Sequence, residues 1–415
     1  MSTAAAVTSS SAAPARQSYL ARQAIYDRDL NAVAYELLYR NGSENQAAVV
    51  DGDQATGEVM FNALVEMGLE QVIGKEQAFV NVTPSILLDG HCEAFPRDRI
   101  VIEVLEDIEP NDEIVAVLKQ LSNDGFTIAL DDFVLHDHLK ELVRIADIIK
   151  IDVLALGREK TAEQVQRLQQ FDVRLLAEKV ETYEDFEFCK GLGMEMFQGY
   201  FVCKPQILEH RTITPDRLGT MQLLARLQDA KLEILELERL LMRDPAICVK
   251  LLRFINSSFC GLRNKVDSIR HAATLVGLRK IRIWAGLLAF GTFNDKPREL
   301  IRAANIRARM CERLAEYMLD KHTDRCFTVG LLSLLDAFSD TPLETMLARL
   351  PLSPEVTSAI LHREGPAGRI LNCVTAYERG DWRSVNKLQL PSDIVRNAYV
   401  ESISWTQMVI DQMHV

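Results

Sequence analysis

The chain lacks features that would place it in several common protein classes. No apolar run reaches the roughly 18 residues that a membrane-spanning helix needs, so we expect no membrane contact. A basic excess is absent as well, because the formal net charge is −12, and this argues against a nucleic-acid-binding protein. The eight cysteines include no CxxC pair, which favours scattered free thiols in a reduced, cytoplasmic protein over a disulfide framework.

The first residues lack the apolar core of a secretory signal. Residues 1–17 are rich in Ala, Ser and Thr, so we expect a flexible tail there. A hydrophobic fraction of 48% and a charged fraction of 26% are typical of a globular protein. At 415 residues the chain is long enough for two domains.

Residues 18–206 alternate short apolar runs with amphipathic helical stretches such as Glu113–Asn123 and Ala162–Gln170. This alternation predicts an α/β domain with a mainly parallel sheet, and the number of repeats favours a closed, TIM-like (β/α) barrel. The predicted strands are Ala32–Leu38, Ala78–Val82, Ile100–Val104, Thr127–Leu130, Ile148–Ile151, Arg174–Ala177 and Met196–Phe201.

Residues 207–415 have a different character, because almost every periodic segment reads as helix. Asp244-Pro245 is typical of a helix N-cap followed by Pro at the first helical position. We therefore predict a second, all-α domain that begins after residue 206. Its predicted helices include Arg217–Leu227, Leu232–Leu241, Ala246–Ile255, Ala303–Leu319, Thr328–Leu335, Leu343–Ala348 and Pro354–Leu361.

Polar residues stand where the predicted strands end. The apolar run Ile128–Leu130 stops in two adjacent carboxylates, Asp131 and Asp132. In a parallel barrel such strand ends meet at one rim, where active sites form. Oxygen ligands suit Mg²⁺ or Mn²⁺, and sharing Asp131 and Asp132 between two ions would suit attack on a phosphodiester. The other polar residues at these ends are Glu36, Asn81, Glu103, Lys150, Asp152, Glu178, Glu181 and Gln198.

Each of these residues also has an ordinary interpretation. A single carboxylate at a strand end is commonly a cap or a solvated loop residue, and Lys150 would serve equally in a structural ion pair. It is the recurrence of the pattern at successive strands that favours a site.

In their order and spacing, these residues resemble the EAL domain, the cyclic-di-GMP phosphodiesterase family. The resemblance covers about Tyr19 to Pro205, with Leu37 in place of the Ala of the family signature. The matching segments are Gln23-Ala24-Ile25, Glu36-Leu37-Leu38-Tyr39-Arg40, Asn81-Val82-Thr83-Pro84, Glu103-Val104-Leu105-Glu106, Asp131-Asp132-Phe133, Lys150-Ile151-Asp152, Ala177-Glu178-Lys179-Val180-Glu181-Thr182 and Gln198-Gly199-Tyr200-Phe201 with Lys204-Pro205.

The resemblance implies a role for each matching residue. Lys150 would act on the attacking water, Glu178 would hold the second metal or the water network, and Gln198 would help to hold that network. Glu106 would anchor the loop after Asp132. The implied metal ligands are Glu36, Asn81, Glu103, Asp131 and Asp132, and the implied nucleotide contacts are Gln23, Arg40, Leu38 and Asp152. The implied cofactors are Mg²⁺ or Mn²⁺ in a two-metal site with inhibition by Ca²⁺, the implied product is pGpG, and a homodimer through this domain is expected.

Two positions depart from the family pattern. After Phe133 the family has a Gly-rich loop, whereas this chain has Val134-Leu135-His136-Asp137-His138-Leu139. Lys179 replaces a Gly beside Glu178, where it would either pair with that carboxylate or point outward. We interpret His136 and His138 as exposed loop residues rather than metal ligands.

The helical half resembles the HDOD family, on the segments Arg243–Leu251, Asn256-Ser257, Ser268-Ile269 and Leu275–Arg279. Metal-binding HD relatives carry His-Asp after a Gly-Leu-Leu turn, but here Ser333-Leu334 follows Gly330-Leu331-Leu332, so we expect no catalysis in this half. Asp336 is a candidate only for a helix-surface or capping role.

Other features of the helical half have structural interpretations. We interpret Trp382 as a core or interface aromatic at a helix start. The Arg-rich segments Arg279–Arg282 and Arg302–Arg313 are interpreted as solvated helix faces with interleaved acids.

Three hypotheses follow. The first is a cyclic-di-GMP phosphodiesterase whose HDOD half regulates it or binds an unidentified protein partner. The second is a catalytically silent cyclic-di-GMP receptor or scaffold, in which the altered loop and Lys179 have removed turnover. The third gives the HDOD half an activity of its own.

Overall fold

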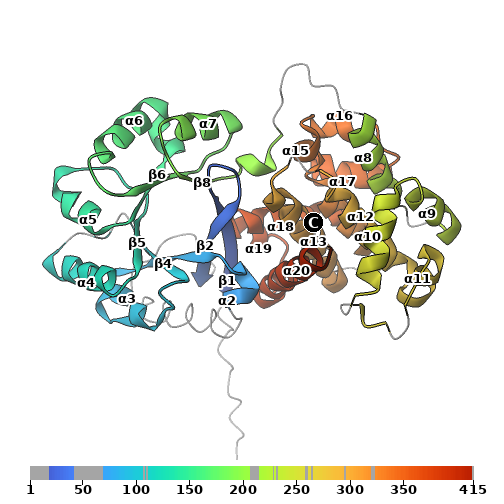
Figure 1. Cartoon of the computed structure of the whole chain (residues 1–415), viewed down its shortest axis with the longest axis horizontal. Coiled ribbons are helices and arrows are strands. Elements are labelled where there is room, and N and C mark those ends of the chain that lie inside the picture. The colour runs from blue at the N-terminus through green and yellow to red at the C-terminus, as the bar shows by residue number, and fades with distance from the viewer. Residues whose placement is uncertain are drawn as a thin grey trace, which may run out of the picture.

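The computed structural model describes residues 18–41, 69–105, 108, 111–205, 215–227, 229, 232–257, 260–262, 265–293, 296–318 and 323–413. These residues form two halves that lie side by side, a barrel and a helical array (Figure 1). The predicted tail, residues 1–17, lies outside the described part. The predicted division into an α/β barrel and an all-α domain is confirmed.

The barrel is closed by eight strands in sequence order, from β1 to β8. Strand β1 runs antiparallel to both of its neighbours, β2 and β8, and all other pairs are parallel. The strands are β1 (Ser18–Tyr26), β2 (Ala32–Asn41), β3 (Gln77–Val82), β4 (Ile100–Val104), β5 (Thr127–Leu130), β6 (Ile148–Asp152), β7 (Arg174–Glu178) and β8 (Met196–Gln198).

Two strand predictions need correction. The first strand, β1, was missed, because Arg22 and Gln23 interrupt its apolar pattern. The last strand was predicted through Phe201 but ends at Gln198, since Gly199 and Tyr200 lead into a short 3-10 helix, η3 (Phe201–Cys203). At Gly199 the φ angle is +156°, and a Cβ there would lie 2.0 Å from the carbonyl oxygen of Val180, so only glycine fits.

One apolar residue from each strand fills the lower interior of the barrel. Because side chains alternate across a strand, the next inward residue lies two positions away. On every strand that next inward residue is polar or charged. The barrel interior therefore has an apolar layer and, nearer the carboxyl ends of the parallel strands, a polar layer. The apolar layer consists of Ile25, Ala34, Phe79, Val101, Ala129, Ile148, Leu176 and Met196.

Helices of the barrel half cover most of the sheet from outside. Side chains of Asn111, Asp152 and Thr182 cap α4, α6 and α7 by accepting backbone N–H bonds, which satisfies donors that a helix start leaves unpaired. These helices are α2 (Leu69–Ile73), α3 (Pro84–Leu88), α4 (Asp112–Asn123), α5 (Lys140–Ile145), α6 (Val153–Leu168) and α7 (Tyr183–Gly191), with 3-10 helices η1 (His91–Ala94) and η2 (Asp137–Leu139).

The helical half contains the predicted helices with some changes of boundary. The expected single helix Thr328–Leu335 is divided after Leu332. The predicted cap is confirmed, because the side chain of Asp244 accepts bonds from the N–H groups of Ala246 and Ile247. The helices run from α8 (Pro215–Leu227), α9 (Ile234–Leu241), α10 (Pro245–Ile255), α11 (Ile269–Val276), α12 (Leu278–Phe290), α13 (Arg298–Met318) and α14 (Thr323–Leu332) to α15 (Leu335–Ser339), α16 (Leu343–Leu347), α17 (Pro354–His362), α18 (Gly365–Glu378), α19 (Trp382–Asn386) and α20 (Ser392–Met413). In the part of the chain that the structure describes, none of the helices has the length and hydropathy to cross a bilayer.

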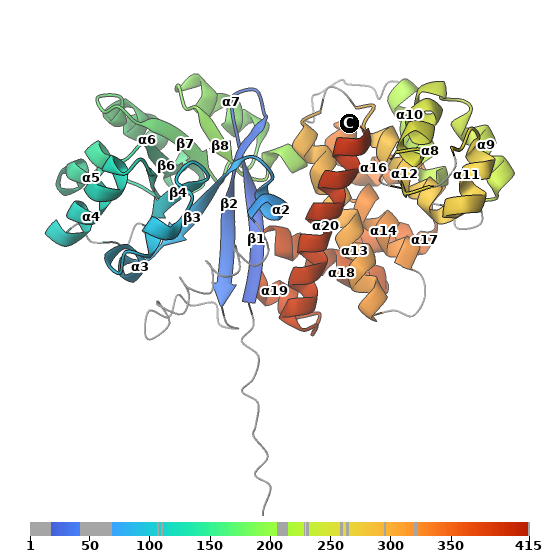
Figure 2. The same ribbon diagram turned by 60° about the horizontal axis from the view of Figure 1, so that its bottom comes forward.

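Helices of the second half cover the outer face of β1. A five-residue turn joins β1 to β2, so no barrel helix follows β1, and α18 and α20 pack there instead (Figure 2). Trp382 at the start of α19 stacks on Tyr19 with ring centroids 5.0 Å apart, which confirms its interpretation as an interface aromatic. The hydroxyl of Tyr377 donates to the carbonyl oxygen of Leu20 at 2.7 Å. The two halves therefore share a buried interface.

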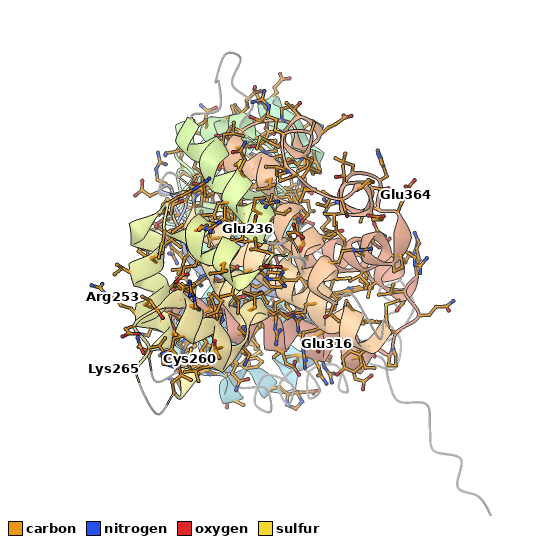
Figure 3. All side chains as sticks on the ribbon, turned by 90° about the vertical axis from the view of Figure 1, so that its right-hand side faces the viewer. Glu236, Arg253, Cys260, Lys265, Glu316 and Glu364 are labelled. Atoms are coloured by element: carbon orange, nitrogen blue, oxygen red, sulfur yellow. The ribbon has the colours of Figure 1, made fainter. Side chains whose placement is uncertain are left out.

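The Arg-rich segments are more buried than the sequence suggested. Arg307 is 2% exposed and Glu312 is 1% exposed, so their interpretation as solvated residues was wrong. Glu312 pairs with Arg279 and Arg309, and Arg307 pairs with Glu378 at 2.6 Å. The outer side of the helical half does carry both signs of charge, with Arg253 and Glu364 at opposite edges of the view in Figure 3.

Candidate active site at the barrel mouth

The polar layer of the barrel holds eight of the predicted site residues. Each of them stands two positions from the apolar layer along its strand, toward the carboxyl ends of the parallel strands. The structure therefore brings together residues that are far apart in sequence. The layer consists of Gln23, Glu36, Asn81, Glu103, Asp131, Lys150, Glu178 and Gln198.

Lys150 lies at the centre of this layer and is completely buried. Its Nζ lies 2.8 Å from a carboxylate oxygen of Asp131 and 2.8 Å from one of Glu178. It also pairs with Glu103, and an oxygen of Glu36 lies 3.6 Å away. One ammonium group therefore faces four carboxyl groups, so negative groups exceed positive ones in a buried space.

Burial and the neighbouring charges shift the pKa values of this cluster. Burial, together with the neighbouring Glu36 and Asp131, raises the pKa of Glu103 well above its ordinary value despite Lys150. Burial also raises the pKa of Glu178, to about 8. Burial by itself would lower the pKa of Lys150, but the surrounding carboxylates outweigh it and raise that pKa well above normal. The pKa values of Glu103 and Glu178 are thus raised mainly by burial, and that of Lys150 is raised by its acidic neighbours.

Two amide side chains complete the layer. Asn81 donates from Nδ2 to Glu36 at 3.2 Å, and Gln198 donates from Nε2 to Glu36 and, at 3.1 Å, to the side-chain oxygen of Gln23. Both amides thus turn their N–H groups to oxygen acceptors and fix the orientation of Glu36. Their own oxygens, Asn81 Oδ1 and Gln198 Oε1, are buried without a hydrogen-bond partner in the described part of the chain.

The donor atoms of this layer fit divalent metal ions. Besides the two amide oxygens, Glu103 Oε2 and Glu178 Oε2 are buried and have no hydrogen-bond partner among the described residues. One group of carboxylate oxygens within 4.8 Å of one another comes from Glu36, Glu103 and Glu178, and a second comes from Asp131, Asp132 and Glu178. Oxygen ligands with surplus negative charge match Mg²⁺ or Mn²⁺. Glu178 belongs to both groups, which the sequence did not indicate.

Lys179 contacts a different carboxylate from the one expected. Its Nζ lies 3.1 Å from Asp132 and 2.5 Å from Asp152, so it neither pairs with Glu178 nor extends freely into solvent. The residue has a φ of +53°, in the left-handed region that glycine adopts most easily, and Asp132 has a φ of +42°. A lysine ammonium is thereby held between one predicted metal ligand and one predicted nucleotide contact.

The loop after Asp132 is packed rather than open. Leu135 is 1% exposed, and its N–H donates to the side-chain oxygen of Gln164 on α6 at 2.9 Å. His136 and His138 are exposed and stack on each other with centroids 5.8 Å apart, outside both carboxylate groups. Gln164, which is buried and holds this loop, was not predicted from the sequence. A helical pattern does not show which of its glutamines will bond a distant loop.

Five predicted residues lie outside the polar layer: Asp132 and Asp152, which pair with Lys179, and Leu38, Arg40 and Glu106. The side chain of Arg40 and all of Glu106 fall outside the described residues. Leu38 is half-buried in β2, where a Cβ on Gly380 of the helical half would lie 3.4 Å from its Cδ1. Leu38 therefore borders the second half of the molecule.

The helical half contacts the barrel mouth, which no sequence pattern predicted. Tyr200, two residues after Gln198, accepts a hydrogen bond from Arg307 of α13 at 2.7 Å, and its hydroxyl lies 3.2 Å from Glu378 of α18. Arg307 also donates to the hydroxyl of Ser333 at 2.9 Å. Through Arg307, Ser333 of the helical half is therefore connected to Tyr200 of the barrel.

Comparison with known proteins agrees with this arrangement. The family model for the EAL domain matches residues 53–205, and the one for the HDOD domain matches residues 218–338. The chain is 34% identical over 398 residues to the cyclic di-GMP phosphodiesterase CdgJ of Vibrio cholerae, covering 94% of this chain and 92% of that protein. It is 31% identical over 404 residues to the uncharacterized protein YuxH of Bacillus subtilis, covering 95% and 99%.

A solved structure of BlrP1 from Klebsiella pneumoniae, a calcium and cyclic-di-GMP complex, covers 46% of this chain and 57% of its own, at 25% identity and a TM-score of 0.38. The full-length relatives and the two family models, in the same order along the chain, lead to one conclusion. This chain belongs to the family of two-domain proteins in which an EAL domain is followed by an HDOD domain.

Proposed function

We propose that this protein hydrolyses cyclic di-GMP to linear pGpG at the mouth of its EAL barrel, with the help of divalent metal ions. The observation that carries the proposal is the buried layer in which one lysine faces four carboxyl groups and several oxygens lack partners. The relative CdgJ, which is similar over nearly the whole chain, is named a cyclic di-GMP phosphodiesterase.

The residues divide into ligands and groups that act on the substrate. Glu36, Asn81, Glu103 and Asp131 would hold one Mg²⁺ or Mn²⁺, and Asp132 with Glu178 would hold a second. When bound, the ions supply an activated water and neutralise charge on the phosphate. Ca²⁺, which prefers more ligands and a looser geometry, is expected to bind without supporting turnover.

Protein groups would then direct the hydrolysis itself. Gln198 and Glu178 orient the attacking water, and a carboxylate of the layer accepts its proton. As the water oxygen bonds to phosphorus, the bond from phosphorus to the ribose 3′ oxygen breaks, and that oxygen takes up a proton. Lys150 stabilises the negative charge that develops on the phosphate oxygens. Gln23, Arg40, Leu38 and Asp152 are proposed to bind the nucleotide around this centre.

A second candidate function is a cyclic-di-GMP receptor without turnover. It is favoured by one specific observation, the ammonium of Lys179 between Asp132 and Asp152, which competes for the second group of ligands. In that case Lys179 and the packed loop after Asp132 would together remove catalysis and leave binding of cyclic di-GMP intact. An independent activity of the HDOD domain has no such support, because among the described residues both candidate metal groups lie in the barrel.

The proposal includes features beyond the reaction. We propose residues 18–206 as the EAL domain and 207–415 as the HDOD domain, a homodimer through the EAL domain, and an HDOD domain that regulates the barrel or binds a protein partner. A cytoplasmic location suits a nucleotide substrate and eight free cysteines.

The test is turnover of cyclic di-GMP by the purified full-length chain with Mg²⁺ and with Mn²⁺, with a binding titration in Ca²⁺ in parallel. Production of pGpG supports the phosphodiesterase. Tight binding in Ca²⁺ without product in either metal supports the receptor instead. Absence of both binding and product would refute a cyclic-di-GMP function.

A further inference from the structure

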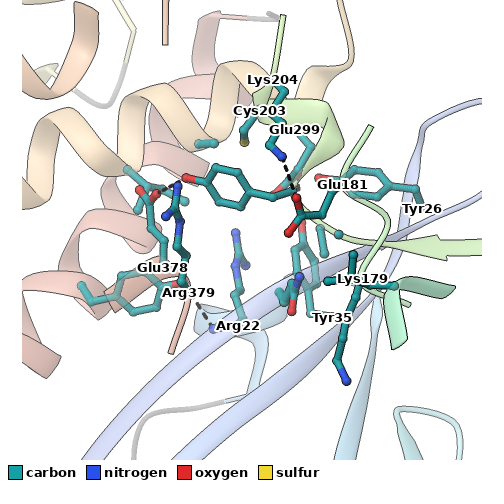
Figure 4. Close-up of a pocket in the computed structure, with 18 residues that line it drawn as sticks. Arg22, Tyr26, Tyr35, Lys179, Glu181, Cys203, Lys204, Glu299, Glu378 and Arg379 are labelled. Carbon is teal, nitrogen blue, oxygen red and sulfur yellow. Dashed lines mark hydrogen bonds and ion pairs between the residues drawn. The ribbon is translucent and has the colours of Figure 1, made fainter. Parts of the chain in front are cut away.

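A cavity of about 520 Å³ lies between the EAL barrel and the HDOD domain (Figure 4). Its barrel side includes Gln23 and Lys179, and its HDOD side includes Glu378 and Arg379 at the end of α18 and Tyr399 of α20. The cavity is large enough for part of a small-molecule ligand.

The cavity begins where the carboxylate layer ends. Gln23, in its wall, accepts a hydrogen bond from Gln198, which also bonds Glu36. Lys179, also in its wall, pairs with Asp132. Gln23 and Lys179 therefore connect the wall of the cavity to the carboxylate layer and to Asp132.

The carboxylates in the cavity wall all have partners within the protein. Glu181 pairs with Lys204 at 3.0 Å. Glu378 pairs with Arg307 at 2.6 Å, and Glu299 accepts a hydrogen bond from Tyr35 at 3.2 Å. None of these acids is left to neutralise a further cation, and the two lysines of the wall are themselves paired.

Two guanidinium groups remain without a carboxylate partner among the described residues, one from each side. Arg22 of β1 lies over the ring of Tyr35 at 4.1 Å and donates to the carbonyl oxygen of Val72. Arg379 lies over the ring of Tyr200 at 4.6 Å and is exposed. Figure 4 shows both side chains in the cavity region. The cavity thus carries surplus positive charge beside a layer with surplus negative charge.

We propose that this cavity binds the second phosphodiester of the cyclic dinucleotide and that Arg379 of the HDOD domain contacts it. This inference rests on the proposed function. A cyclic dinucleotide carries two phosphodiesters, and only one of them can lie at the carboxylate layer while it is cleaved. The other is repelled by the acids and is attracted to the arginines, whose planar donors match phosphate oxygens.

The consequence is that the HDOD domain forms part of the nucleotide site. The end of α18 is already fixed, because Glu378 beside Arg379 is held by Arg307 and by Tyr200 of the barrel. Nucleotide binding and the packing of the two domains would then stabilise each other, since any ligand that contacts both favours the packed state.

The experiment titrates cyclic di-GMP into the full-length protein in Ca²⁺, comparing the wild type with Arg379→Ala. Loss of one charge-assisted contact is expected to weaken the affinity about tenfold or more. Arg369→Ala is the matched control, because Arg369 is exposed on the same helix and does not line the cavity. Thermal unfolding is measured for every variant, and if Arg379→Ala unfolds early, Arg379→Gln is judged by the same criterion.

The outcomes separate this inference from the proposed function. A wild type that does not bind cyclic di-GMP overturns both. A wild type that binds, with Arg379→Ala binding as tightly as Arg369→Ala, overturns the role of the HDOD domain and leaves the phosphodiesterase proposal standing. Weakened binding only in the Arg379 variant supports the inference.

Discussion

The two halves of the molecule bury charged residues in opposite ways. In the EAL barrel, Lys150 faces four carboxyl groups, and four oxygens of the layer have no partner within the described residues. In the HDOD domain, the buried Arg307 is matched by Glu378, Ser333 and Tyr200, and the buried Glu312 is matched by two arginines.

The two buried clusters differ in their balance of charge, and this difference distinguishes a ligand-binding site from a structural contact. A balanced buried cluster holds elements together and needs nothing further. An unbalanced one is costly unless a ligand completes it. The comparison therefore favours the barrel over the helical half as the place of the proposed site.

The strongest test of this comparison is Glu36→Ala. Removing one proposed ligand should lower hydrolysis of cyclic di-GMP by more than about 100-fold, because even indirect partners of a metal ligand cost 10–100-fold. The fold should remain, since the change relieves repulsion in an acid-rich cluster. Turnover with Mg²⁺ or Mn²⁺ and the melting temperature are measured together. Glu163→Ala, an exposed change on α6, is the control, and full activity in Glu36→Ala would show that the assigned site is wrong.

A paired stability experiment compares Lys150→Met with Arg307→Met. Each leaves buried carboxylate without its cation, so the free energy of unfolding without metal should fall by about 3 kcal/mol or more. Added Mg²⁺ should restore part of the stability of Lys150→Met, because a divalent ion can take over the lost positive charge. It should not restore Arg307→Met. The free energy of unfolding is measured by denaturant titration with and without Mg²⁺. If Mg²⁺ restores the stability of both variants equally, the proposed difference between the two halves is wrong.

Lys179→Asn examines the resident ammonium. Asparagine tolerates a positive φ and removes the charge, so Asp132 and Asp152 become available to a metal ion. We expect about tenfold tighter binding of Mn²⁺ or an additional bound ion, measured by calorimetric titration. Lys119→Asn, which removes an exposed pair with Glu141, is the control. Identical titrations for Lys179→Asn and the wild type would mean that Lys179 does not compete with metal.

The smallest effect is expected for His136→Ala combined with His138→Ala. Both rings are exposed, and neither histidine belongs to the two sets of carboxylates that could hold a metal ion. Affinity for Mn²⁺ should stay within about twofold of the wild type, which is small beside the tenfold that corresponds to 1.4 kcal/mol. A large loss of affinity would place a histidine ligand in the loop and extend the site beyond the barrel layer.

Much of the site was readable from local pattern. An apolar run followed by a polar residue at its carboxyl end marks Glu103, Asp131 and Glu178, because side chains alternate along a strand and parallel strands end at one rim. Strand β1 was not predicted from this pattern. Arg22 faces the other domain and Gln23 faces the polar layer, so neither face of the strand has an uninterrupted apolar pattern. The ion pairs of Lys179 could not be predicted either, because its position in the sequence does not show how far it lies from Asp132 in the folded chain.

The sequence by itself determined the barrel, the helical second half and the residues of the polar layer, because strand alternation and helix periodicity are local properties of the chain. Only the tertiary structure decided that Glu178 belongs to both sets of candidate metal ligands, that Lys179 lies between Asp132 and Asp152, and that Arg379 lines the cavity between the two halves. These relations join segments up to hundreds of residues apart. The position of Arg379 depends on how β1 is covered by α18 and α20, and no local pattern encodes that packing.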